Sequence, residues 1–228
     1  MENKIVLSGD IIASTSLNKE EKLVVEKELK HLLTILDDKF SVYSRIIKGD
    51  YLEMVVEKPE DALGITLLIK SYIKSIELNE INSDKRYKNF KNHGIRIAMG
   101  FGKLNRFDRE NGIIDGDAIY FSGRKISEES TTYNKERIVI KNTLFFVSDK
   151  ESLNQNVNTQ LGLIDVLLTN GTSKQCKIIF YRLLGMSEIE IAKKLNIKQP
   201  TVNKQLTSIG WNAIEKSVTY FSSIIKNN

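Results

Sequence analysis

Apolar and polar residues alternate over positions 44–56, on both sides of Gly49 and Asp50. This period of two predicts two short strands joined by a hairpin, with Gly-Asp at its tip. A short apolar run over 4–12 predicts a buried strand that carries Asp10 near its end. Between them, apolar residues at spacings of three and four predict a helix from Asn18 to about Phe40.

The pattern beyond the hairpin predicts further elements of both kinds. The glycines at 100 and 102 indicate a bend or a close backbone approach within a central strand. The expected elements are a helix over 60–77, a helix end and loop over 78–92, a strand over 94–102, a charged loop over 103–112, a helix opening near 115, and a strand over 137–146.

The second half of the chain is helical in pattern. Residues 148–159 are rich in Ser, Asn, Gln and Lys, and we interpret them as a linker. The expected division is therefore an α+β domain over 1–148 and an all-α domain over 149–228. The fold class is α+β followed by helices.

Composition and charge indicate which kinds of partner and which compartment suit this protein. The chain has 228 residues, 41% of them hydrophobic, and a net charge of +5. Residues 171–228 hold nine basic and three acidic residues, a net of +6. A basic tail favours nucleic-acid binding, although lysines that merely solvate surface helices give the same count. One cysteine and no apolar run of eighteen residues indicate a cytoplasmic protein without a membrane span.

Two carboxylates end apolar strands, Asp10 and Asp50. A strand, a helix and a hairpin can bring them side by side, where oxygen donors suit a divalent metal such as Mg²⁺ or Mn²⁺. The alternative is that Asp50 is only a turn-forming residue.

The order of elements resembles the class III nucleotidyl cyclase domain, a relative of the polymerase palm and of GGDEF-like domains. That resemblance implies a ferredoxin-like core in which Asp10, Asp50 and the backbone at Ile11 bind metal. It also implies phosphate or nucleotide binding by the segment after Asp10 and by an arginine. The predicted nucleotide-binding residues, including a lysine beside the hairpin tip, are Ser14, Thr15, Ser16, Lys48 and Arg124.

Two positions depart from the cyclase pattern. Tyr120 stands where the cyclases have an asparagine, and Ile46 stands where they have the lysine that selects adenine. These departures favour a domain that binds nucleotide and metal without turnover. An active nucleotidyl transferase or cyclase, with the tail serving localisation or dimerisation, is the alternative. A purely structural module with inherited aspartates is a third.

A further resemblance covers most of the chain. The segments at 8–12, 48–50, 94–100 and 115–124 resemble the bacterial SatD family. That family adds little functional detail.

Residues 185–206 have the pattern of two short helices joined by a turn. Ser187 can cap the first, Pro200 suits a first turn, and Val202 and Leu206 point inward at spacing four. The pattern resembles the terminal helix-turn-helix of LuxR-type regulators and sigma factors, which implies DNA binding. The alternative is a packing or dimerisation unit. The outward residues expected to contact DNA are Lys198, Gln199, Thr201, Asn203, Lys204 and Gln205.

The sequence therefore predicts a cytoplasmic, DNA-binding transcriptional regulator. Its N-terminal domain is expected to bind nucleotide and divalent metal, and the protein is expected to be a homodimer.

Overall fold

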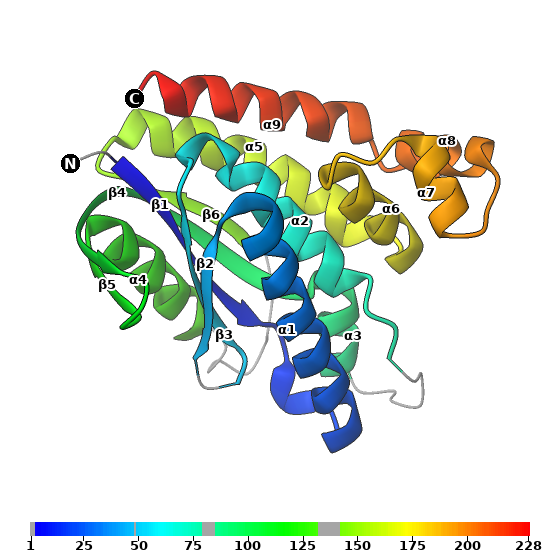
Figure 1. Ribbon diagram of the computed structural model, residues 1–228, viewed down its shortest axis with the longest axis horizontal. Coiled ribbons are helices and arrows are strands. Elements are labelled where there is room, and N and C mark those ends of the chain that lie inside the picture. Colours follow the sequence, from blue (N-terminus) through cyan, green and yellow to red (C-terminus); the bar gives the residue numbers. More distant parts are fainter. Residues whose placement is uncertain (1–2, 48, 79–84, 132–141) are drawn as a thin grey trace.

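The chain folds into a mixed α and β structure, seen in a computed structural model that describes residues 3–47, 49–78, 85–131 and 142–228. Its central sheet has the strand order β2-β3-β1-β4-β5, and β6 pairs in parallel with β4 (Figure 1). The other strand pairs of the described residues are antiparallel. The strands are β1 (Asn3–Ile11), β2 (Tyr43–Ile47), β3 (Tyr51–Val56), β4 (Ile95–Asp108), β5 (Ile113–Gly116) and β6 (Leu144–Val147).

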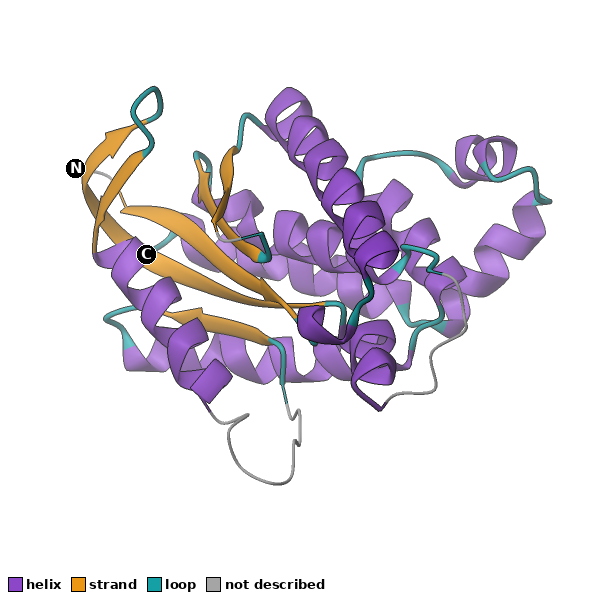
Figure 2. Cartoon of the chain, turned by 90° about the horizontal axis from the view of Figure 1, so that it is seen from below, coloured by secondary structure: helices purple, strands orange, loops and turns teal. Residues whose placement is uncertain are grey.

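Helices cover both faces of the sheet (Figures 1 and 2). α4 covers one face, and α1, α2, α5 and α9 contribute to a continuous apolar core with the other. Two 3-10 turns, η1 (Ser14–Ser16) and η2 (Pro59–Asp61), precede α1 and α2. The helices are α1 (Lys19–Phe40), α2 (Ala62–Lys74), α3 (Lys85–His93), α4 (Asp117–Thr131), α5 (Glu151–Asn170), α6 (Ser173–Leu183), α7 (Glu188–Lys194), α8 (Gln199–Ser208) and α9 (Trp211–Lys226).

Local signals located the first helix correctly. Asn18 and Glu21 form a reciprocal capping box, which satisfies two backbone donors at the start of α1. The buried side of α1 includes Val25, Leu29, Leu32 and Leu36, so its apolar stripe faces the sheet. The glycine signal in β4 is also confirmed. A methyl group on Gly100 would lie 2.0 Å from the carbonyl oxygen of Ala118, because α4 packs directly on the strand there.

Two segments expected to be loops are ordered elements. Residues 103–112 belong largely to the β4–β5 hairpin, because Leu104, Phe107 and Ile114 pack against the small cluster formed by Val6, Val55 and Ala118. Within 78–92, α3 forms because Tyr87 and Phe90 are both 2% exposed, on one buried side of that helix. Of the strand expected over 137–146, residues 144–146 belong to β6. Residues 137–141 of the expected strand lie outside the described residues.

The expected linker over 148–159 is wrong, because α5 begins at Glu151. Leu153, Val157 and Leu161 lie at helical spacing and are buried in the main core. A polar residue between them forms hydrogen bonds with the backbone of β6. The side chain of Asn158 accepts from the backbone N–H of Phe146 (2.9 Å) and donates to its carbonyl (2.7 Å). The predicted boundary at 148/149 thus falls directly before a helix that shares the core of the sheet.

A buried charged pair also connects α2 to α5. Lys70 on α2 is fully buried, and its ammonium lies 3.2 Å from the carboxylate of Asp165 on α5. The same ammonium donates to the backbone carbonyls of His93 (3.0 Å) and Ile95 (3.2 Å). Asp165 accepts from the hydroxyl of Thr143 at 2.7 Å. This network connects elements from both halves of the chain.

Lys74, one turn further along α2, donates to the last carbonyls of α5. Its acceptors there include the carbonyls of Leu168 and Thr169. A cation at a helix C-terminus is favourable because the carbonyl dipoles accumulate there. Burial lowers the pKa of Lys74 to about 8.

His93, at the end of α3, makes the stability of the fold sensitive to mild acid. Burial is the largest cause that lowers the pKa of His93 to about 4, and the nearby charge of Lys70 is the second. The unfolded chain takes up this proton near pH 6.5, whereas the native state does not. The unfolded state therefore binds more protons between about pH 6.5 and 4, and the native state loses stability as the pH falls through that range.

We expect His93→Gln to reduce this loss. The measurement is the midpoint of thermal unfolding at several pH values between 7 and 4, compared with the unsubstituted protein. His31→Gln is the matched control, because His31 lies at the surface. An unchanged pH dependence in His93→Gln would contradict the assignment.

None of the described helices has both the length and the apolar character needed to cross a bilayer.

Candidate functional site

Asp10 lies near the end of β1, between two other strands of the sheet. It stands opposite Tyr51 on β3 and opposite Arg96 on β4. The guanidinium of Arg96, which is 2% exposed, lies 3.2 Å from a carboxylate oxygen of Asp10. Burial raises the pKa of Asp10, Arg96 opposes this effect, and Asp50 adds to it. Asp10 is thus paired with the buried guanidinium of Arg96, and the charge of Asp50 also acts on it.

Asp50 occupies the turn between β2 and β3, at the same end of the sheet. Gly49 before it has a φ of +81°, which glycine adopts without strain. The backbone N–H of Ile11 donates to the carbonyl of Asp50 at 3.1 Å, so the tip of the hairpin is tied to the end of β1. Asp10, near the end of β1, and Asp50, in the turn before β3, therefore lie at the same end of the sheet. The sequence predicted both at the ends of neighbouring strands, whereas Asp50 lies in the turn, one residue before β3 begins.

The segment after β1 forms the wall of a cavity with this turn. Ala13 adopts a left-handed conformation, and the η1 turn follows it. The hydroxyl of Ser14 donates to the carboxylate of Asp50 at 2.6 Å. The cavity has a volume of about 320 Å³. The predicted residues that line it are Ile11, Ser14, Thr15 and Asp50.

Other residues predicted to bind metal or nucleotide do not line this cavity in the part of the chain that the structure describes. Among the described residues, the wall of this cavity includes Asp50 but not Asp10. The hydroxyl of Ser16 donates to the carbonyl of Ala13 at 2.7 Å. Lys48 is outside the described residues.

Arg124 is on α4, where it bonds Glu128 (2.8 Å) and the hydroxyl of Tyr120 (2.9 Å). It lines a separate cavity beside β6. In a single chain, the structure therefore does not bring Arg124 into the cavity that Asp50 lines.

Three charged residues near these carboxylates were not predicted from the sequence. Lys22 and Glu26, from the first turns of α1, line the cavity with Asp50. Arg96 pairs with Asp10. Its position inside an otherwise apolar strand was a signal, because a buried arginine requires a partner.

The donor chemistry of this end of the sheet fits a hard divalent cation only in part. Two carboxylates and backbone oxygens are suitable ligands. However, the described part of the chain contains no group of three or more His, Cys, Asp or Glu side chains that could hold a metal ion. Arg96 already neutralises Asp10, so a metal ion at this carboxylate would compete with a buried guanidinium.

The second candidate surface is formed by α7 and α8. Ser187 and Glu190 form a capping box at the start of α7. The turn after α7 passes through Asn196, which has a positive φ of 51°. Val202 and Leu206 are buried, as predicted, and hold α8 to the rest of the helices.

The outward face of α8 is mostly open to solvent. Four of the predicted DNA-contacting residues are exposed, and Thr201 and Gln205 are half-buried. The exposed ones are Lys198, Gln199, Asn203 and Lys204. Glu188 on α7, which was not predicted to take part, accepts hydrogen bonds from the side-chain amides of Gln199 and Asn203. Each amide uses one N–H in its bond to Glu188 and keeps a second N–H and its amide oxygen for other contacts.

No family model and no curated protein matches the sequence. Two solved structures of a bacterial light-regulated adenylyl cyclase are similar to the chain. One has a TM-score of 0.45 and 17% identity and covers 63% of this chain and 42% of that one. The other has a TM-score of 0.44 and 18% identity, with coverage of 64% and 43%. The chain thus spans less than half the length of these solved chains.

Proposed function

We propose that this protein is a DNA-binding transcriptional regulator whose α+β part binds a nucleotide and a divalent metal. The observation that carries the proposal is the α7–α8 unit. Its buried Val202 and Leu206 leave a polar, lysine-bearing face of α8 exposed. This is the geometry expected of a helix-turn-helix, in which the second helix enters the major groove.

The charge of the tail supports the DNA-binding half of the proposal. Residues 171–228 carry a net charge of +6, from nine basic and three acidic residues. Lys198 and Lys204 on the exposed face are suited to phosphate or guanine, and Asn203 is suited to adenine. Asn203 donates one amide N–H to Glu188, so a contact with a base would use its second N–H and its amide oxygen, or would replace the bond to Glu188.

The cavity beside Asp50 supports the nucleotide half. Ser14, Thr15 and Lys22 line it together with the carboxylates of Glu26 and Asp50, and the hydroxyls and the ammonium suit phosphate oxygens. The strand order β4-β1-β3-β2, with α1 and α2 on the same face, is also the order expected of a ferredoxin-like core.

We expect replacement of Lys198 or Lys204 by Ala to weaken DNA binding by the full-length protein. If the replaced lysine binds a phosphate, the slope of log affinity against log salt should fall by about 0.9. The measurement is a fluorescence-anisotropy titration of a random-sequence duplex at several salt concentrations. Lys216→Ala on α9 is the matched control, because it removes an exposed lysine of the same basic tail. Absence of binding at low salt, or equal slopes in all four proteins, would leave α7–α8 as a packing unit.

Arg96 should limit metal binding at Asp10. We expect Arg96→Met to raise the affinity for Mn²⁺ by about fivefold, since a partly exposed ion pair contributes roughly 1 kcal/mol. Isothermal titration calorimetry measures the affinity. Arg96→Lys keeps the charge and should not show this gain in affinity. Asp10→Asn, added to Arg96→Met, should abolish the gain. Equal affinity in the Met and Lys variants would show that Arg96 does not compete with the metal.

An active nucleotidyl transferase or cyclase is the second candidate, favoured by the position of Asp10 near the end of β1 and of Asp50 in the turn before the neighbouring β3. The test is chromatography of products after incubation with ATP or GTP and Mn²⁺. A product that disappears in Asp10→Asn would establish the enzyme. Arg96 and the Tyr120 and Ile46 departures lead us to expect none.

A further inference from the structure

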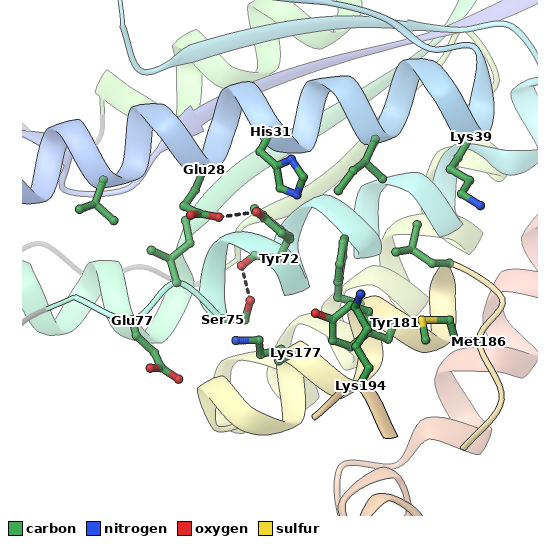
Figure 3. Close-up of a pocket in the computed structure, with 15 residues that line it drawn as sticks. Glu28, His31, Lys39, Tyr72, Ser75, Glu77, Lys177, Tyr181, Met186 and Lys194 are labelled. Atoms are coloured by element: carbon green, nitrogen blue, oxygen red, sulfur yellow. Dashed lines mark hydrogen bonds between the residues drawn. The ribbon is translucent and has the colours of Figure 1, made fainter. Parts of the chain in front are cut away.

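A groove lies where α6 and the end of α7 meet α1 and α2 (Figure 3). Its volume is about 750 Å³, and it is separate from the cavity beside Asp50. Residues of α1 form one wall, and residues of α6, of the turn after it and of the end of α7 form the other. The groove is therefore bounded by elements from both halves of the chain.

Aromatic rings line part of the groove, although Tyr72 and Phe180 are only 8% and 3% exposed. Tyr72 on α2 lies 4.7 Å from Phe180, and Phe180 lies 5.2 Å from Tyr181, between ring centroids. His31 on α1 continues the series, 6.4 Å from Tyr72. The accessible rings, those of His31 and Tyr181, suit a flat apolar body, because ring faces and edges both offer favourable contacts.

Three lysines from three different helices line the same groove. Lys39 belongs to α1, Lys177 to α6 and Lys194 to α7, and Figure 3 shows them with the aromatic rings. In the part of the chain that the structure describes, none of the three forms an ion pair, although Lys194 lies 5.3 Å from the centre of the Tyr181 ring.

The acidic side chains of the groove do not cancel this charge. Glu28 accepts a hydrogen bond from the phenol of Tyr72 (Figure 3). Burial and Glu28 together raise the pKa of Tyr72, so the phenol stays protonated and keeps donating. Glu77 is exposed at the end beyond α2. The groove thus keeps an excess of positive charge beside an aromatic surface.

We propose that this groove binds a small, flat aromatic molecule that carries an anionic group. The aromatic rings would hold its body, and the lysines would hold its charge. A ligand that spans Lys39 and Lys194 would connect α1 to α7. The proposal does not depend on DNA binding or on the site at Asp50.

The experiment uses the full-length protein and the fluorescent probe anilinonaphthalene sulfonate, a flat aromatic anion. We expect saturable binding at a ratio of one probe to one chain. Phenylnaphthylamine, which has the same rings without the sulfonate, should bind more weakly. Inorganic phosphate should not displace the sulfonate probe, because phosphate lacks the apolar body.

Substitutions of lining residues test whether the probe binds in this groove. Lys39→Glu and Lys177→Gln should each weaken binding of the anionic probe by about threefold to tenfold, and Tyr181→Ala should weaken binding of both probes. Lys27→Glu is the matched control, since it makes the same charge change at another exposed position of α1. Thermal unfolding verifies that each variant is folded. Lys39 is exposed, so its variant provides a test if the α6 variants unfold.

Two results would overturn the proposal. One is an absence of saturable binding. The other is equal affinity for the anionic probe in Lys39→Glu and in Lys27→Glu. Complete displacement by phosphate would contradict the aromatic part of the assignment, and equal affinity for the charged and uncharged probes would contradict the anionic part.

Discussion

Lys70→Ala is expected to lower the free energy of unfolding by about 3–5 kcal/mol, because it removes one partner of a buried ion pair. The carboxylate of Asp165, 3.2 Å from the ammonium in the native protein, would keep a buried charge without its cation. The carbonyls of His93 and Ile95 would also be deprived of the donor that Lys70 supplies. Urea-induced unfolding measures the decrease in stability.

A double variant separates the charge effect from a simple change in packing. Lys70→Met with Asp165→Asn removes both charges and keeps an amide oxygen that can accept from Thr143. We expect it to recover much of the stability that Lys70→Ala loses, since a buried pair often contributes little more than apolar residues of similar volume. A decrease below about 1 kcal/mol in Lys70→Ala would contradict the importance of this pair.

Val202→Asp is expected to disrupt the α7–α8 unit. Val202 is fully buried, and an unpaired carboxylate there would cost more than about 4 kcal/mol, which is enough to detach a short helix. Local opening limits the global cost, because the sheet does not depend on α8 for its pairing. Hydrogen exchange should show loss of protection in α7 and α8 and retention in β1. DNA binding, where present, should be abolished as well.

Thr207→Asp is the matched control. Thr207 lies on the same helix and is exposed, so the same new charge stays in water. It should leave the exchange of α7 and α8 close to that of the unsubstituted protein. Full protection of α8 in Val202→Asp would show that this position tolerates a charge, and it would contradict the inward role that the sequence predicts for Val202.

Local patterns predicted much of the fold. The capping box at Asn18, the alternation around Gly49 and the spacing of Val202 and Leu206 each depend on neighbours in sequence, and each predicted its element correctly. The same reasoning failed for 148–159. Its polar composition resembled a linker, but Asn158 satisfies the backbone of β6, a contact that depends on a distant strand.

The candidate site shows the same division. The sequence predicted Asp10 and Asp50 at the ends of neighbouring strands, and the structure has Asp10 near the end of β1 and Asp50 in the turn that precedes β3. The sequence did not predict that Arg96 pairs with Asp10, or that Glu188 accepts hydrogen bonds from Gln199 and Asn203.

The sequence by itself determined most of the elements, their buried sides and the basic charge of the tail, because periodicity and composition are local properties. Only the tertiary structure decided which charges meet. Lys70 and Asp165 are 95 positions apart by subtraction (165 − 70), and their pairing depends on how α5 packs against α2. The groove between α1 and α6 was likewise decided by packing, since its lysines come from three helices that only the folded chain brings together.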